Sequence, residues 1–136
     1  MRTYWDSSAL LNALASKAVF DRLASGENLT RSHGYAEVSS HLSGRGLPMK
    51  DGTRQKVSSA DAARMIESLS QRFSVRDLTF PETLATIRSA EEIGVQGGRI
   101  HDLLHAISAK LCGADLILSR DKGFSTLGQG IKIEWP

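Results

Sequence analysis

The sequence RIHDLLHAISAKLCGADLILSRDKGF, from Arg99 to Phe124, combines a helical pattern, a buried strand and a charged turn. Its apolar residues recur at the spacing of one helix face, at Ile100, Leu103, Leu104, Ile107 and Leu111. Gly113 ends that pattern, and residues 115–119 predict a buried strand that leads into Ser-Arg-Asp-Lys. A helix followed directly by a buried strand is typical of an α/β fold with a parallel sheet.

Strand patterns and helix patterns alternate over the rest of the chain. Short strands are expected at residues 3–5, 29–32, 74–78 and 131–135. Helices are expected at residues 8–14, 16–25, 34–44, 58–73 and 79–94. The glycine-rich stretch 44–57 is expected to form a loop. This alternation predicts a single domain over residues 1–136, an α/β sandwich with a mainly parallel sheet.

The composition is that of an ordinary globular protein, with 40% hydrophobic and 24% charged residues in 136 positions. The single cysteine, Cys112, excludes an intrachain disulfide and indicates a reducing compartment, so we expect a cytoplasmic location. No apolar run approaches about 18 residues, so no membrane span is expected, and Asp6 precedes any apolar segment of the signal-peptide kind. The net charge of +2 is compatible with a polyanionic partner but does not identify one.

Four acidic residues are expected at one edge of this sheet. Asp6 directly follows the first strand, and Asp121 follows the strand that ends at Leu118. Glu37 and Asp102 lie near the starts of helices that begin at the same edge. Because the crevice of an open parallel sheet lies beyond the carboxyl ends of its strands, these carboxylates can converge there. Two carboxylates about 4 Å apart repel by about 4 kcal/mol at an effective dielectric constant of about 20, so such a cluster requires cations. Carboxylate oxygens suit Mg²⁺ or Mn²⁺.

Each acid also has a purely structural interpretation, and the residues alone leave both interpretations open. Asp6 fits a helix N-cap, and Glu37 fits a solvated helix acid. Asp102 fits a first-turn acid favoured by the helix dipole, and Asp121 fits an Asx-turn.

Three segments, in this order, resemble PIN-domain ribonucleases, specifically the VapC-type toxins of toxin–antitoxin pairs. They are YWDSSALLNAL from Tyr4, HGYAEVSSHLSG from His33, and the segment from Arg99 to Phe124. The resemblance implies a PIN-like three-layer sandwich, with a central mainly parallel sheet flanked by helices. It also implies a catalytic quartet that binds Mg²⁺ or Mn²⁺, formed by Asp6, Glu37, Asp102 and Asp121, with Ser8 and Ser119 as supporting hydroxyls.

The function that the resemblance implies is metal-dependent endonucleolytic hydrolysis of RNA, by a toxin that binds an antitoxin and forms a homodimer. Such hydrolysis uses an activated water rather than a protein nucleophile. Basic residues expected to hold RNA phosphates are Arg31, Arg45, Arg54, Lys56, Arg99 and Arg120. Gly123 stands where many members of the family carry a further acid, so one versus two metal ions stays open, as do the RNA target and the antitoxin.

The sequence is also compatible with other functions. A phosphoaspartyl hydrolase also begins with an aspartate after its first strand, but Ser8 stands where its second aspartate belongs. A PIN-like module that binds RNA or protein without cutting would be favoured by loss of one of the four acids, and none is lost. His101 and His105 have the i, i+4 spacing of some zinc sites, but without a third soft ligand we expect them to flank the crevice or cap packing contacts.

Overall fold

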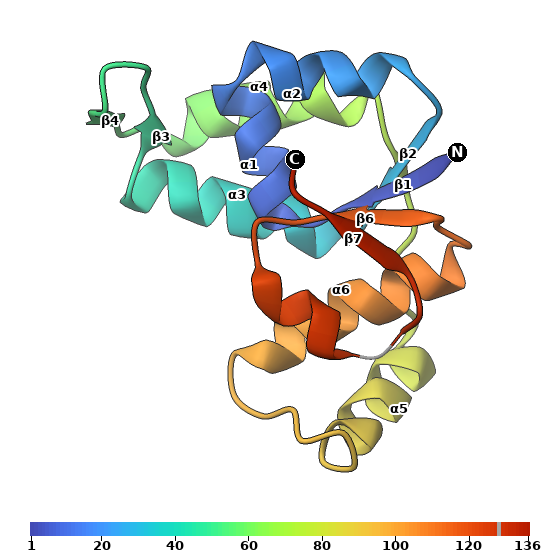
Figure 1. Ribbon diagram of the computed structural model, residues 1–136. Helices are drawn as coiled ribbons and strands as arrows, with labels where there is room; N and C mark the ends of the chain where they lie inside the picture. Colours follow the sequence, from blue (N-terminus) through green and yellow to red (C-terminus); the bar gives the residue numbers. More distant parts are fainter. Residues whose placement is uncertain (128) are drawn as a thin grey trace.

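A parallel β-sheet forms the centre of the computed structural model, which describes residues 1–127 and 129–136 (Figure 1). The strand order is β5-β2-β1-β6-β7, and every neighbouring pair is parallel. The strands are β1 (Arg2–Trp5), β2 (Glu27–Thr30), β5 (Ser74–Val75), β6 (Leu116–Leu118) and β7 (Lys132–Glu134). The predicted α/β architecture with a mainly parallel sheet is therefore confirmed.

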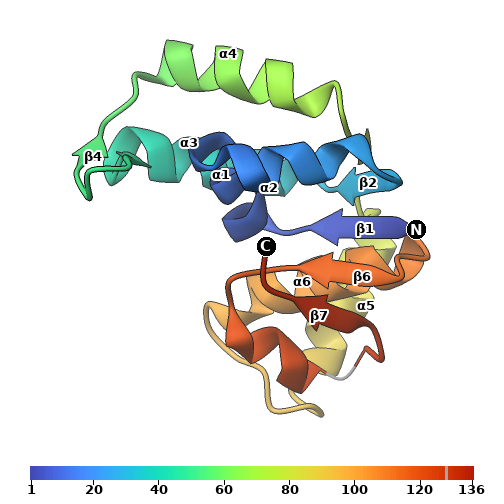
Figure 2. The same cartoon turned by 45° about the horizontal axis from the view of Figure 1, so that its top comes forward.

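Helices cover both faces of this sheet (Figures 1 and 2). One face carries α1 (Ser7–Ala15), α2 (Lys17–Asp21), the 3₁₀ helix η1 (Arg22–Ala24), α3 (Ser32–Gly44) and α4 (Ser59–Ser70). The other carries α5 (Phe80–Ala90), α6 (Arg99–Leu111) and the 3₁₀ helix η2 (Lys122–Leu127). The arrangement is the three-layer sandwich that the resemblance implied. No helix among the described residues has both the length and the apolar character needed to cross a bilayer.

The central strand β1 is buried on both sides, because helices cover both faces of the sheet. Successive side chains of a strand point to opposite faces, so they enter different cores. Trp5 packs with Leu10 and Leu42 in the core beneath α1 and α3, whereas Tyr4 packs with Leu103 in the core beneath α6. All five of these side chains are at most 1% exposed. Burial of each such side chain stabilises the fold by about 1.5–3 kcal/mol.

The register of the central strands determines what lies at the carboxyl edge of the sheet. Trp5 pairs with Leu118, so the residues that follow them, Asp6 and Ser119, emerge side by side. The backbone N–H of Asp6 also donates to the carbonyl of Leu118 at 3.3 Å. The loop after β6 therefore lies beside the start of α1.

The stretch 44–57 differs from its prediction as a loop. It contains a two-stranded antiparallel hairpin, β3 (Leu47–Pro48) and β4 (Arg54–Gln55). Gly46 permits this hairpin, because its φ is 96° and a β-carbon there would lie 2.8 Å from the Gln55 backbone. The 3₁₀ helix η2 was also not predicted, and the strand expected at residues 29–32 begins two residues earlier than predicted, at Glu27.

Candidate active site

Asp6 is a buried carboxylate that three donors hold in place. It is 3% exposed and serves as the N-cap of α1, with Oδ1 accepting the N–H of Ala9 at 2.9 Å. The Ser8 hydroxyl donates to Oδ1 at 2.7 Å, and the Ser119 hydroxyl donates to Oδ2 at 2.5 Å. Burial raises the pKa of Asp6, and these hydrogen bonds oppose the rise. The N-cap interpretation and the position at the sheet edge therefore both hold for this residue.

Ser8 and Ser119 connect Asp6 to the loop after β6. Besides donating to Asp6, the Ser8 hydroxyl accepts the backbone N–H of Arg120 at 2.8 Å. The Ser119 hydroxyl likewise accepts the backbone N–H of Asp121 at 2.9 Å. Each serine thus donates to the carboxylate and accepts from the loop backbone, so the position of Asp121 is fixed relative to Asp6.

Asp102 and Asp121 form a carboxyl pair beside Asp6. Asp102 lies half-buried in the first turn of α6, and Asp121 lies close enough to act on its side chain. Burial, followed by the proximity and the charge of Asp121, raises the pKa of Asp102 to about 7, and Asp6 adds a smaller repulsion. Carboxylates this close repel each other when both are ionised, which favours a proton on Asp102.

Asp121 is exposed and forms the Asx-turn that was its structural interpretation. Its Oδ1 accepts the N–H of Gly123 at 2.8 Å. A β-carbon at Gly123 would lie 3.0 Å from that Oδ1, so a side chain there would press on the carboxylate. The Gly123 carbonyl accepts a hydrogen bond from Nη2 of Arg99 at 3.1 Å, which places the Arg99 guanidinium next to this turn.

Glu37 comes from α3 and makes a different set of contacts. Its Oε1 lies 2.8 Å from Nε2 of His105, and its Oε2 accepts the Ser7 hydroxyl at 3.2 Å. Burial alone would raise the pKa of Glu37, but the hydrogen bond and charge of His105, with smaller effects of His33 and Ser7, lower it overall. Glu37 is therefore ionised at neutral pH.

The structure brings Asp6, Asp102 and Asp121 to one edge of the sheet, while Glu37 contacts His105, which lies on the same helix as Asp102. His105 lies near enough to three of the acids for its charge to lower the pKa of Asp6, of Glu37 and of Asp102. In the part of the chain that the structure describes, no group of three or more His, Cys, Asp or Glu side chains has an arrangement that could hold a metal ion. The four predicted acids thus share one region without forming a closed coordination sphere.

His105 and its partner Tyr4 were not predicted as site residues. Tyr4 is 0% exposed and His105 is 1% exposed, and the phenol oxygen lies 2.7 Å from Nδ1 of the imidazole. His101, one helical turn earlier, is exposed and stacks on His33 with ring centroids 5.3 Å apart. The two histidines therefore face different surroundings. The signal in the sequence was a histidine within the apolar run Leu-Leu-His-Ala-Ile, which indicates burial.

An open groove of about 600 Å³ runs along α3 from Glu37 to Arg45. His33, His41 and His101 contribute to its walls. Arg54 of the hairpin adjoins it, with Nη1 at 3.3 Å from Nε2 of His41. This groove joins two of the predicted RNA-binding arginines to one of the predicted acids.

The remaining predicted RNA-binding residues are spread more widely. Lys56 is exposed after the hairpin, and Arg99 lies at the start of α6 beside the Asp121 turn. Arg31 precedes α3 and is half-buried, and its Nη1 has no hydrogen-bond partner among the described residues. The Arg120 guanidinium lies 4.9 Å from the ring centroid of Trp135. Among the predicted RNA-binding residues, Arg99 thus has its guanidinium beside the Asp121 turn.

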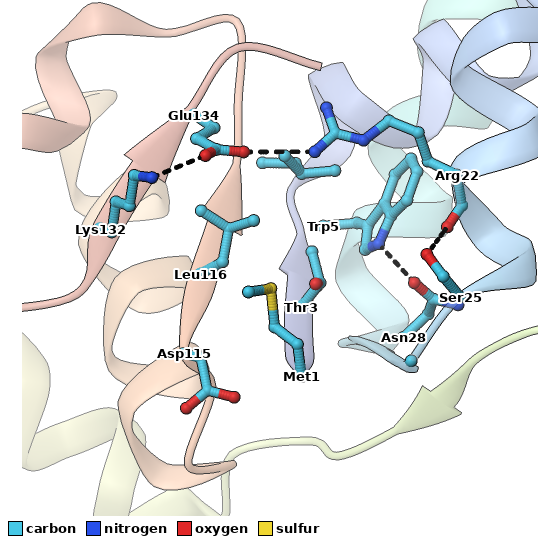
Figure 3. A pocket seen from close by; sticks show the side chains of 12 residues that line it. Met1, Thr3, Trp5, Arg22, Ser25, Asn28, Asp115, Leu116, Lys132 and Glu134 are labelled. Carbon is cyan, nitrogen blue, oxygen red and sulfur yellow. Dashed lines mark hydrogen bonds and ion pairs between the residues drawn. The ribbon is translucent and has the colours of Figure 1, made fainter.

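A second pocket, of about 470 Å³, lies over the sheet between η1 and β7 (Figure 3). None of the four acids is among the described residues that line it. Its charged side chains pair with one another, since Glu134 lies 3.3 Å from Arg22 and 2.8 Å from Lys132. This pocket therefore lies apart from the acidic site, and its charged side chains are paired with one another rather than with the four acids.

The raised pKa of Asp102 predicts a pH dependence of stability. Because the folded pKa of about 7 exceeds the ordinary value of 3.8, the folded chain binds this proton more tightly than the unfolded chain. In metal-free buffer the free energy of unfolding should therefore fall as pH rises from about 4 to about 7. Chemical denaturation across this range should show a smaller fall for Asp102→Asn, and the exposed control Asp115→Asn should behave as wild type. Equal pH dependence in wild type and Asp102→Asn would contradict the carboxyl pair.

Comparisons with known proteins identify the fold. No family model matches the sequence. No curated protein matches it either. VapBC2 from Rickettsia felis, crystallised bound to a DNA fragment from its promoter, superimposes with a TM-score of 0.69 at 14% identity, over 100% of this chain and 99% of that chain. PAE2754 from Pyrobaculum aerophilum superimposes with a TM-score of 0.66 at 22% identity, over 98% of this chain and 89% of that chain. The chain therefore shares the fold of these structures, and its architecture is the PIN-like fold that its sequence predicted.

Proposed function

We propose that this protein is a metal-dependent endoribonuclease that hydrolyses RNA phosphodiester bonds. The observation that carries the proposal is the Asp102–Asp121 carboxyl pair beside the buried carboxylate of Asp6, at the carboxyl edge of a parallel sheet. A half-buried acid whose pKa is raised by neighbouring carboxylates at such an edge is typical of a functional site.

The chemistry of this donor set fits Mg²⁺ or Mn²⁺. Asp6, Asp102 and Asp121 offer carboxylate oxygens, which these ions prefer, and the repulsion that raises the pKa of Asp102 is one that a divalent cation would offset. Glu37 would complete the set. A bound divalent ion would supply positive charge to the phosphate and lower the pKa of a water molecule.

The chain's own residues would hold this site in a fixed geometry. Ser8 and Ser119 orient Asp6 and, through the loop backbone, Asp121. The Arg99 guanidinium beside the Asp121 turn is placed to offset negative charge from an entering phosphate. Hydrolysis by an activated water requires no nucleophilic side chain, which agrees with a site built from carboxylates and hydroxyls.

The groove along α3 supports an extended, single-stranded RNA substrate. It begins at Glu37 and ends at Arg45, with Arg54 adjoining, so a strand whose scissile phosphate reaches the acids could place flanking phosphates on these cations. Contacts of this kind provide affinity without sequence choice. Base preference would come from unstacked bases along the groove.

We further infer that the protein is the toxin of a toxin–antitoxin pair. The likeness to VapBC2 covers the whole chain, which supports a protein antitoxin as partner. We also propose a homodimer as the assembled form, which follows from the resemblance in the sequence alone. A cytoplasmic location, where RNA is accessible, agrees with the single buried cysteine.

A second candidate is a PIN-like module that binds RNA or protein without cutting. It is favoured by one observation: among the described residues, the acids do not form a group arranged to hold a metal ion. The two candidates differ in whether the acids are needed for a reaction, so replacement of one acid by its amide distinguishes them.

Replacement of Asp102 by asparagine should lower the cleavage rate of labelled single-stranded RNA in Mg²⁺ or Mn²⁺ by at least about 100-fold. The amide keeps the shape of the side chain but removes its charge, so RNA binding should persist. Asp115→Asn, at the opposite end of β6, is the matched control and should cut as wild type. Expressed alone, the wild type should arrest growth and Asp102→Asn should not. Cleavage by Asp102→Asn at the wild-type rate would contradict the proposed reaction.

Neutralising the groove cations should change the salt dependence of RNA binding. The double variant Arg45→Gln/Arg54→Gln should bind more weakly, and the slope of log affinity against log salt should become shallower by about 1.4, at about 0.7 per phosphate contact. The exposed cations Arg88 and Lys110 lie outside this groove, so Arg88→Gln/Lys110→Gln is the control. Equal slopes for the two double variants would rule out the groove as the RNA path.

A further inference from the structure

Tyr4, His105 and Glu37 form a continuous chain of side-chain hydrogen bonds. The Tyr4 hydroxyl lies 2.7 Å from Nδ1 of His105, and Nε2 of the same ring lies 2.8 Å from Oε1 of Glu37. Tyr4 belongs to β1, His105 to α6 and Glu37 to α3. This series of hydrogen bonds therefore connects the central strand, through the helix that carries Asp102, to a helix on the opposite face of the sheet.

The partners of His105 determine where its proton lies. Oε1 of Glu37 is a carboxylate oxygen, which accepts, and it lies 2.8 Å from Nε2, so Nε2 carries the hydrogen. In a neutral ring Nδ1 then accepts, and the Tyr4 hydroxyl donates to it. Burial raises the pKa of Tyr4 well above its usual value, so the phenol keeps the proton that it donates. In a neutral ring the hydrogen bonds therefore run from Tyr4 through His105 to Glu37, and in a charged ring Nε2 still carries the hydrogen toward Glu37.

Packing holds the imidazole in this orientation. Its ring makes an edge contact with the Tyr4 ring, with centroids 5.8 Å apart. Gly34, in the first turn of α3, packs closely beside the ring, because a β-carbon there would be 3.2 Å from Cδ1 of Leu10, 3.3 Å from Oγ1 of Thr30 and 3.6 Å from Cε1 of His105. A glycine at this position therefore allows α3 to approach closely enough for Glu37 to meet the histidine.

We propose that His105 is a positioning residue that holds the Glu37 carboxylate toward the other acids, and that Tyr4 fixes the His105 tautomer that does so. The inference deepens the proposed function and rests on it, since it assigns Glu37 to the site of RNA cleavage. His105 lies three residues after Asp102 on α6. A single helix thus presents one acid directly and orients a second, which comes from the opposite layer of the sandwich.

The tautomer is tested directly by long-range ¹H–¹⁵N NMR of the imidazoles in the intact protein without metal. The expected result is a His105 ring with a hydrogen on Nε2, with the exposed His101 as an internal reference in the same spectrum. Tyr4→Phe removes only the hydroxyl, so the Nδ1-protonated tautomer should gain population. A wild-type His105 protonated at Nδ1 alone would overturn the assignment.

The positioning role is tested by comparing His105→Leu with His105→Gln. Glutamine keeps an amide N–H near the position of Nε2, whereas leucine fills the space without a donor. In Mg²⁺, His105→Leu should lower kcat for RNA cleavage by about 10–100-fold with little change in KM, and His105→Gln should recover most of the loss. Equal loss in both variants, or a rise in KM with kcat unchanged, would overturn the role.

Two measurements separate this inference from the proposed function. The unfolding midpoint of each variant shows whether a loss of rate reflects a loss of fold, and Tyr4→Phe provides a milder variant if His105→Leu is unstable. If the wild type cuts no RNA, the proposed function fails, and the tautomer then decides the inference. An Nε2-protonated ring that responds to Tyr4→Phe upholds the chain of hydrogen bonds, and any other result overturns it.

Discussion

Parallel pairing of β1 with β6, with Trp5 opposite Leu118, determines the position of the acids at the sheet edge. This register brings Asp6 beside Ser119, whose hydroxyl donates to Asp6 and accepts the N–H of Asp121. A shift by one residue would turn Asp6 toward the other face of the sheet and separate it from the loop after β6. The register is enforced by the core, because Trp5 and Leu118 are each 1% exposed.

The same edge concentrates negative charge that the rest of the fold must stabilise. Asp6 is buried, Asp102 has a pKa raised to about 7 beside Asp121, and Glu37 keeps its charge through His105. Such an arrangement costs stability in the absence of cations, and the cores on both faces of the sheet offset that cost. We infer that the charge is retained because the site needs it for a cation and a phosphate.

Periodic and local features of the structure could be predicted from the sequence. The apolar stripe from Ile100 to Leu111 predicted α6 closely, and the strand patterns predicted a parallel sheet and hence an edge where acids gather. The hairpin within residues 44–57 was missed because its strands have two residues each and a glycine-rich composition favours a loop. The role of His105 could not be predicted, because its partners come from β1 and α3, and no local pattern encodes those contacts.

Anomalous diffraction from a crystal soaked in Mn²⁺ tests the central claim most directly, because it locates the ion without reference to activity. We expect a peak at the carboxyl edge of the sheet, with oxygens of Asp6, Asp102 and Asp121 at about 2.0–2.2 Å. An Asp102→Asn crystal soaked in the same way should show a weaker peak or none. A wild-type crystal with no peak among these carboxylates, at a Mn²⁺ concentration that occupies other sites, would contradict a metal-dependent nuclease.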